Sequence, residues 1–278
     1  MRPSLLALSV LALFTSAIPA TSAGASTSHA CRSAGHCEVS AVPVGPTNSS
    51  EPSGEAPLSP TALSGYRRVF LDDFQQSPLS HSWSTFAGQP GSDPGAQWAP
   101  SHVTEGGGVL SLNAWRDPAY GNSWVTGGLC VCQQAQTYGA YFVRARMTGP
   151  GATFVGLLWP TNGGWPPEID FTETYGALSR SMATVHYGSS NQQIHQVVQV
   201  DMTAWHTWGV IWTPHSLTYT LDGRVWGRVR NPLAIPHVRM SLHLQQQTWC
   251  SLGYACPTQP VSTQIDWVEI FHSTRLKD

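Results

Sequence analysis

Short runs of strand-forming residues recur along the chain from residue 66 onward, and apolar and polar positions alternate or cluster within each run. Gly, Pro, Asn and Asp separate the runs at short intervals, which is typical of strands joined by turns. No segment keeps a helical period over three turns. The pattern predicts an all-β domain that forms one sandwich of antiparallel strands. The clearest runs are Val109–Asn113, Tyr141–Met147, Val197–Val200, Leu217–Leu221 and Ser241–Gln245.

Two of these runs make local predictions. The Asp222–Gly223 pair between strand-like segments predicts a tight hairpin turn, because this pair accepts positive φ angles. In the run that ends at Gln245, His243 and Gln245 alternate with leucines. Successive strand residues point to opposite faces, so His243 and Gln245 are expected to share one face, where they can line a cleft.

One strand-like run holds three carboxylates within six residues, Glu168-Ile-Asp-Phe-Thr-Glu173. Alternation places Glu168 and Asp170 on one face, but the next position on that face is Thr172. A β-bulge would absorb one residue and bring Glu173 to the same face. Two glutamates facing one cleft suit glycoside hydrolysis, in which one acid protonates the leaving oxygen and one carboxylate attacks or activates water. Solvent-facing acids on an ordinary amphipathic strand are the alternative interpretation.

The acidic run belongs to a longer segment, Gly164–Glu173, and six further segments surround it in a fixed order. They are Val69–Phe74 with Trp83, Tyr138–Arg146, Thr184–Gly188, Trp205–Trp212, Leu221–Gly223 and Ile265–Phe271. This ordered set, over residues 66–273, resembles glycoside hydrolase family 16 in its bulged-motif, laminarinase-like form. The resemblance implies a concanavalin-like jelly-roll β-sandwich of two bent antiparallel sheets with a concave substrate cleft.

The resemblance also implies roles for the three acids. Glu168 is expected to be the nucleophile and Glu173 the general acid/base of a retaining, double-displacement mechanism. Asp170 is expected to hydrogen-bond to Glu168 and, because a nearby like charge raises a carboxyl pKa, to help keep Glu173 protonated. This chemistry requires no cofactor.

Four other residues are candidates for substrate binding. Trp165 and Trp159 match tryptophans that border the cleft of the family, and an indole ring suits stacking against a pyranose. His186 can hydrogen-bond to a sugar hydroxyl or to a catalytic carboxylate, and Gln245 can line the cleft beside His243. Core packing of the tryptophans and a purely structural histidine are the alternatives.

A metal site is implied at Asp266. Some members of the family hold a structural calcium ion on the convex side through backbone carbonyls and an aspartate of the last strand, where Asp266 stands. Calcium takes six to eight oxygen ligands, and carbonyl ligands cannot be seen in a sequence. A cross-strand structural role for Asp266 is the alternative.

The glycan is predicted from what the motif and composition exclude. The bulged motif argues against the lichenase and xyloglucan transglycosylase forms, and charged residues are only 11% of the chain with a formal net charge of −2. This composition disfavours a sulfated polymer, nucleic acid or an anionic membrane as partner. We expect internal cleavage of a neutral β-1,3- or mixed-linkage glucan by a monomer. Many bacterial laminarinases have Gly and Met where this chain has Pro167 and Thr172, which weakens the prediction of the glycan. The alternatives are a retaining transglycosylase that remodels a wall polysaccharide and a non-catalytic carbohydrate-binding sandwich.

The chain divides into three parts. Residues 1–25 combine a charged start, an apolar run of about ten residues and a small-residue stretch, which predicts a signal peptide cut after Ala23 or Ala25 and a secreted, extracellular protein. Residues 26–62 are rich in Ser, Pro and Gly and poor in large apolar residues, which predicts a disordered linker. Residues 63–278 are the predicted catalytic domain.

The six cysteines all follow the predicted signal peptide, and secretion favours disulfides. Six cysteines allow fifteen pairings, so counting does not fix the connectivity. A metal site at Cys130 and Cys132 is disfavoured, because their spacing differs from the Cys-x-x-Cys of zinc sites. Pairs able to close small loops are Cys31 with Cys37 and Cys250 with Cys256, while Cys130 and Cys132 can bridge each other or reach other partners.

Overall fold

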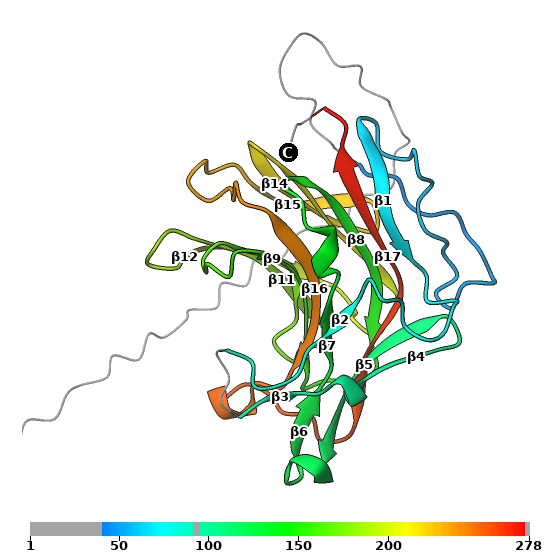
Figure 1. Ribbon diagram of the computed structural model, residues 1–278, viewed down its shortest axis with the longest axis vertical. Coiled ribbons are helices and arrows are strands. Elements are labelled where there is room, and N and C mark those ends of the chain that lie inside the picture. The colour runs from blue at the N-terminus through cyan, green and yellow to red at the C-terminus, as the bar shows by residue number, and fades with distance from the viewer. Residues whose placement is uncertain (1–40, 92–94, 276–278) are drawn as a thin grey trace, which may run out of the picture. The chain divides into compact units, whose positions relative to one another are not determined.

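Two β-sheets form the chain in the computed structural model, which describes residues 41–91 and 95–275. These residues lie in one unit, Val39–Asp278. Figure 1 shows β16 of one sheet and β17 of the other as long, curved strands in separate layers. The all-β jelly-roll prediction is confirmed. The predicted signal peptide lies outside the described residues, and no helix within them is long and apolar enough to cross a membrane.

The larger sheet has ten strands in the order β15-β14-β13-β8-β17-β5-β6-β3, with β1 paired to β17 and β4 to β5. All its pairs are antiparallel except β3 with β6. The strands are β1 (Tyr66–Asp72), β3 (Gln97–Trp98), β4 (Val103–Gly106), β5 (Val109–Asp117), β6 (Ser123–Thr126), β8 (Gly139–Met147), β13 (His206–Thr213), β14 (Ser216–Leu221), β15 (Arg224–Val229) and β17 (Val261–Ser273).

The smaller sheet has seven antiparallel strands in the order β12-β11-β10-β9-β16-β7-β2. They are β2 (Ser84–Thr85), β7 (Gly128–Cys130), β9 (Thr153–Pro160), β10 (Glu168–Glu173), β11 (Arg180–Tyr187), β12 (Gln192–Gln199) and β16 (Met240–Gln247). Within the described ranges, four short 3-10 helices join the strands: η1 (Pro100–His102), η2 (Pro118–Tyr120), η3 (Cys132–Gln134) and η4 (Cys250–Leu252).

The main core lies between the two sheets and follows from strand alternation. Leu242 and Leu244 of β16 are fully buried in the same apolar cluster as Tyr141 and Val143 of β8. Burial of one such aliphatic side chain stabilises a fold by about 1.5–3 kcal/mol. The other face of the seven-stranded sheet is turned away from this core, and we call it the cleft face.

The disorder prediction for residues 26–62 is wrong for residues 41–62, which pack on the outward face of the ten-stranded sheet. Leu58 is buried in a second cluster with Trp267 and Phe271 of β17. The Leu58 N–H donates to a Glu269 carboxylate oxygen over 2.9 Å, and the Trp267 indole donates to the Glu55 carbonyl over 2.9 Å. Specific hydrogen bonds to buried β17 groups therefore order a segment that has few apolar residues. Residues 26–40 lie outside the described part.

Local predictions about turns and cysteines hold. Asp222 and Gly223 have φ angles of 48° and 75° and join β14 to β15. Disulfides link Cys130 to Cys132 and Cys250 to Cys256. The predicted pair of Cys31 and Cys37 lies outside the described residues.

Candidate active site

A bulge in β10 brings the three acids to the cleft face. Against β9, Asp170 pairs with Leu157 and Glu173 pairs with Val155, although three positions separate the two acids and only two separate their partners. Residues two apart on a strand share a face, so Glu173 joins Asp170 and Glu168. The predicted bulge is confirmed.

The neighbours of the bulge make it stable. Gly156 lies opposite, and a Cβ at this position would come within 2.9 Å of Thr172 Cγ2 and 3.0 Å of Phe171 Cζ. The Ser181 hydroxyl lies 2.9 Å from the Thr172 hydroxyl and accepts the Glu173 N–H over 3.0 Å. The backbone group displaced by the extra residue is therefore satisfied.

Glu168 and Asp170 form one hydrogen-bonded group with two aromatic side chains. The Trp165 indole N–H donates to Glu168 Oε2 over 2.7 Å, and His186 Nε2 lies 3.3 Å from Asp170 Oδ2. His186 also pairs with Glu168 across the β10–β11 ladder. The predicted contact of His186 with a carboxylate is thus present, and it falls on Asp170.

The protonation of this pair follows from burial. Burial raises the pKa of both Glu168 and Asp170 well above the usual range, and the Asp170 charge raises that of Glu168 further. The two carboxyl groups hydrogen-bond to each other, which requires one proton between them. Asp170 is only 2% exposed, whereas Glu168 is half-buried and accepts the Trp165 N–H. The hydrogen bond between them raises the pKa of Glu168 and lowers that of Asp170, so the two carboxyl groups act as a pair that shares one proton.

Glu173 has the properties of an acid that is protonated near neutral pH. Burial, the largest cause, raises its pKa to about 7, and the charge of Glu168 adds to the rise. A hydrogen bond with Tyr175 and the charge of His186 act in the opposite direction. The Oε2 atom of Glu173 is buried with no protein partner. The predicted upward shift is present, but its causes are burial and the charge of Glu168, and the charge of Asp170 is not among them.

Two hollows lie beside the acids. The first, about 360 Å³ in volume, is lined on the Glu173 side by Tyr175, Arg180, His195 and Tyr254 among others. The second, about 550 Å³, has Trp165 and Pro167 in one wall and the segment from Leu233 to Pro236 in another. Glu173 itself lines the first hollow, whereas the second adjoins Glu168 only through Trp165, whose indole donates to that carboxylate.

The sequence profile of glycosyl hydrolases family 16 matches residues 91–269, more than half of the 278 residues. The chain belongs to glycoside hydrolase family 16. A sequence relative is the endo-1,3-1,4-beta-glycanase EglC of Rhizobium meliloti, 32% identical over 157 residues, which are 51% of this chain and 33% of the relative. This family 16 chain thus spans about a third of that relative's length.

Solved structures of other family 16 members share the fold. The laminarinase from Rhodothermus marinus has a TM-score of 0.68 and 21% identity, covering 74% of this chain and 97% of that structure. A variant of a non-specific endo-β-1,3(4)-glucanase, co-crystallised with 1,3-β-D-cellobiosyl-cellobiose, has a TM-score of 0.67 and 20% identity, covering 76% and 96%. At this identity the likeness shows the jelly-roll fold.

The predicted substrate contacts of this family 16 chain lie on the cleft face. Trp165 is 45% exposed, so it is not a core residue. Trp159 is half-buried, with its ring centre 6.5 Å from that of His243. His243 and Gln245 share the face, as predicted, but they are 9% and 8% exposed and form its floor. Burial lowers the pKa of His243 to about 4. Contact of these residues, and of His186, with sugar stays a prediction.

Sequence reasoning missed the aromatic wall beside Glu173. Tyr175 packs against Trp249 and Tyr254, with ring centres 4.9 and 5.5 Å away. A local signal existed for Tyr175, which follows the motif by two residues. No local signal existed for Tyr254, because the loop closed by Cys250–Cys256 reaches Glu173 only through the fold.

Asp266 of the last strand has one satisfied oxygen and one orphaned oxygen. Its Oδ2 accepts the Ser53 N–H over 3.1 Å, while Oδ1 is buried without a protein partner. Burial, and after it the charges of Asp266 and Asp73, raise the pKa of Glu51, so these three acids lie near one another. An orphaned oxygen among acids fits a hard cation. Calcium at Asp266 remains a prediction, which thermal unfolding with and without a chelator would test.

Proposed function

We propose that this chain is a secreted, endo-acting glycoside hydrolase that cleaves internal β-linkages of a neutral β-1,3- or mixed-linkage glucan with retention of configuration. The observation that carries the proposal is the β10 bulge, which turns Glu168, Asp170 and Glu173 to one face, with Glu173 lining a hollow. A retaining pair needs carboxyl groups about 5 Å apart on one sugar. The charge of Glu168 acts on Glu173, which supports such proximity.

The first step forms a glycosyl-enzyme. The Glu168 carboxylate attacks the anomeric carbon while Glu173 gives its proton to the departing glycosidic oxygen. The Trp165 N–H holds one oxygen of Glu168, and Asp170 holds the carboxylate through the shared proton. Glu168 is therefore oriented before the substrate arrives.

The second step releases the sugar with the roles of Glu173 reversed. As a carboxylate, Glu173 takes a proton from a water molecule, and the resulting hydroxide attacks the anomeric carbon and frees Glu168. Loss of the Glu173 proton in the first step prepares it as this base. A pKa of about 7 suits both duties at neutral pH.

Support for the substrate class comes from the hollows and from relatives. A hollow lined by Glu173 and a second one lined by Trp165, the partner of Glu168, leave room for sugar units beyond the cleaved bond, which favours internal cleavage. The relatives and structural neighbours include a 1,3-1,4-β-glycanase, a laminarinase and a β-1,3(4)-glucanase. Secretion rests on the predicted signal peptide at residues 1–25.

A retaining transglycosylase is the second candidate, and the hollow beside Glu173 favours it. Tyr175 and Tyr254 line this hollow, and tyrosine faces suit a sugar acceptor as well as a leaving sugar. Hydrolysis and transfer share every catalytic residue. Product analysis with and without an oligosaccharide acceptor separates them, because only a transglycosylase lengthens the acceptor in preference to releasing reducing ends.

Chemical rescue tests the proposed reaction. A Glu168→Ala variant with an aryl β-glycoside should regain turnover in azide and yield the glycosyl azide of inverted configuration, because azide occupies the space of the missing carboxylate. Full activity of Glu168→Gln or Glu173→Gln on laminarin and mixed-linkage glucan would contradict the assignment. A panel of neutral and charged β-glycans, scored by released oligosaccharides, tests the substrate class.

A further inference from the structure

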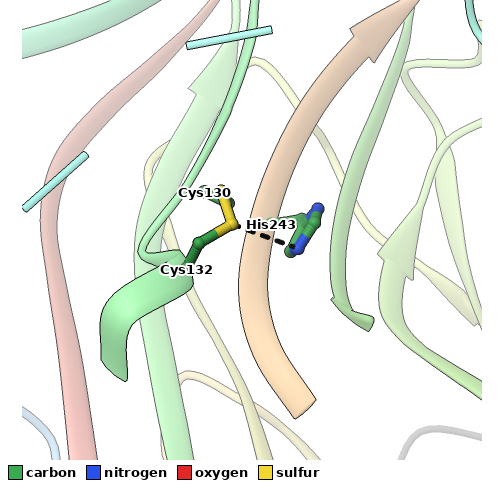
Figure 2. A group of neighbouring side chains, drawn as sticks. All are labelled: Cys130, Cys132 and His243. Atoms are coloured by element: carbon green, nitrogen blue, oxygen red, sulfur yellow. Dashed lines mark hydrogen bonds between the residues drawn. A yellow bond between two sulfur atoms is a disulfide. The ribbon is translucent and has the colours of Figure 1, made fainter. Parts of the chain in front are cut away.

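A cluster of three metal-ligating side chains lies on the cleft face away from the carboxylates. Cys130 ends β7, Cys132 begins η3, and His243 lies in the middle of β16. Figure 2 shows the two sulfur atoms and the imidazole converging. One ligand atom from each residue lies within 4.8 Å of the others.

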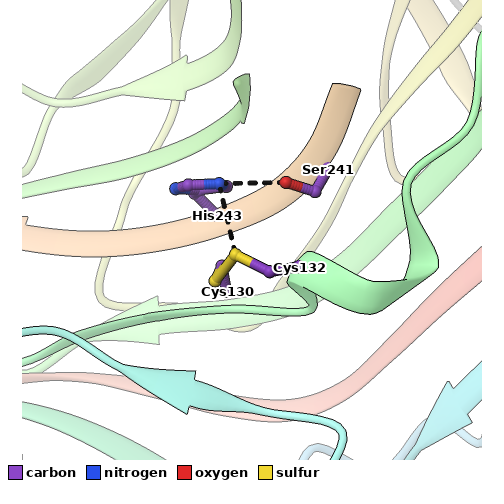
Figure 3. The surroundings of a disulfide bond; sticks show 4 residues. All are labelled: Cys130, Cys132, Ser241 and His243. Carbon is purple, nitrogen blue, oxygen red and sulfur yellow. Dashed lines mark hydrogen bonds between the residues drawn. A yellow bond between two sulfur atoms is a disulfide. The ribbon is translucent and has the colours of Figure 1, made fainter. Parts of the chain in front are cut away.

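The distances are close to those of a tetrahedral site. His243 Nε2 lies 3.9 Å from Cys132 Sγ. With Zn–S near 2.3 Å and Zn–N near 2.0–2.1 Å, neighbouring ligand atoms of a tetrahedral zinc are about 3.6 Å apart. Figure 3 shows the Ser241 hydroxyl on the same ring nitrogen, at 3.1 Å. If the hydroxyl donates, it occupies the Nε2 lone pair, and a metal bound to this nitrogen would take the place of that hydrogen bond.

The backbone keeps both cysteines beside the histidine independently of the disulfide. Cys130 pairs with His243 in the β7–β16 ladder. Val131, which separates the cysteines, is fully buried, and its N–H donates to the Leu242 carbonyl over 3.0 Å. Opening the S–S bond therefore leaves two sulfurs next to the imidazole, and only side-chain rotation is needed to separate them to the spacing of metal ligands.

We propose that reduction of the Cys130–Cys132 disulfide creates a site for one soft divalent cation, Zn²⁺ or Cd²⁺, held by Cys130, Cys132 and His243 with a fourth position for water. A dithiol reductant supplies two electrons and two protons to the S–S bond and becomes a cyclic disulfide. Metal binding then displaces the two thiol protons to solvent. In the disulfide form the sulfurs carry no thiolate charge, so the site is closed to metal.

The chain contains a matched pair for comparison. Cys250 and Cys256 also form a disulfide. Among the described residues, however, neither of them belongs to a group of three or more metal-ligating side chains within reach of one another. After reduction, two thiols alone should bind the cation more weakly than two thiols with an imidazole.

The position of the site has a consequence that rests on the proposed function. His243 pairs with Leu157 of β9, and Leu157 pairs with Asp170 of β10. A cation at His243 therefore lies on the floor of the cleft, two strands from the proposed catalytic residues. Bound metal should reduce hydrolysis by reduced enzyme and leave oxidised enzyme unaffected.

Cadmium titration of the full chain tests the site without reference to activity. The protein is reduced with a dithiol, desalted under argon and titrated with Cd²⁺, with thiolate-to-cadmium charge-transfer absorption as the readout. We expect one equivalent to bind tightly to reduced protein and none to oxidised protein. Cys130→Ser/Cys132→Ser should abolish this binding, Cys250→Ser/Cys256→Ser should retain it, and His243→Gln should weaken it at least tenfold.

Alkylation of each cysteine, read by peptide mass spectrometry, provides a measurement that needs no variant. Cd²⁺ should protect Cys130 and Cys132 and leave the other four cysteines reactive. Equal binding by oxidised protein, protection of other cysteines instead, or an unchanged affinity in His243→Gln would overturn the proposal. Tight binding in a protein that cleaves no glycan would leave the site standing and refute the proposed function instead.

Discussion

Buried acids occur on both sheets, but they differ in their hydrogen-bond partners. On β17 of the ten-stranded sheet, Glu269 accepts hydrogen bonds from Arg68 Nη1 over 2.8 Å and from the Leu58 N–H over 2.9 Å. On β10 of the seven-stranded sheet, Glu173 keeps one buried oxygen without any protein partner. The first acid is enclosed by residues 41–62, whereas the second lines an open hollow.

This comparison shows that a raised pKa alone does not identify a catalytic acid. Burial raises the pKa of Glu269 and of Glu173 alike to about 7. The difference lies in what compensates for burial. Glu269 has a cation and a backbone donor, so its hydrogen-bonding environment is complete, whereas Glu173 lines a hollow and keeps one oxygen without a hydrogen-bond partner.

The largest expected difference between the two acids is in hydrolysis. Glu168→Gln and Glu173→Gln should each lower kcat/KM on a neutral β-glucan by about a thousandfold or more, because general acid and nucleophile are lost. Glu269→Gln, the matched control, should stay within about threefold of the wild type. A similar loss in all three variants would show that the effect is structural.

The free energy of unfolding, unlike hydrolysis, should depend on the surroundings of Glu269. Arg68→Ala leaves the Glu269 carboxylate without its cation, which should lower the free energy of unfolding by about 2 kcal/mol at pH 8. At pH 5, below the Glu269 pKa of about 7, the carboxyl is already protonated, so the loss should be much smaller. Urea unfolding at both pH values measures this.

The wild type has its own pH dependence with the same sign. Because the folded pKa of Glu269 and Glu173 lies above the unfolded value, the folded state binds more protons between about pH 4.5 and 7. These two acids therefore make stability fall as pH rises across this window. If Arg68→Ala costs the same stability at pH 5 and pH 8, the ion pair does not act as described.

The pH profile of catalysis should separate the two acids further. Hydrolysis should fall as pH rises through about 7, because Glu173 must carry a proton to release the leaving sugar. With an activated aryl glycoside, glycosylation by Glu173→Gln should lose this alkaline limb. If Glu269→Gln also lost the alkaline limb, the limb could not be attributed to ionisation of Glu173.

A smaller effect is expected at the indole that holds the nucleophile. Trp165→Phe removes the N–H donated to Glu168 over 2.7 Å, and this should lower kcat/KM about tenfold. Without that donor the pKa of Glu168 rises, so the acidic limb of the pH profile should move to higher pH. Trp159→Phe is the control, and an acidic limb that moves equally in both variants would contradict the role of Trp165.

Sequence reasoning succeeded where the signal was local. The bulge was predicted because simple alternation does not place Glu173 on the face of Glu168 and Asp170. The hairpin was predicted from Asp222–Gly223. It failed where distant segments meet. Residues 41–62 lack an apolar pattern, and they are ordered by donors that reach Asp266 and Glu269, more than 200 positions away. The position of Tyr254 beside Glu173 was missed for the same reason, because only the fold brings these two residues together.

Trapping the covalent intermediate tests the central claim, that Glu168 and Glu173 act on one bond from one face of β10. The chain is incubated with a 2-deoxy-2-fluoro β-glucosyl or laminaribiosyl donor that has a good leaving group, and the peptides are sequenced by mass spectrometry. We expect one fluorosugar per chain, attached to Glu168, with the label persisting in Glu173→Gln. A label on any other residue, or first-formed products of inverted configuration, would contradict it.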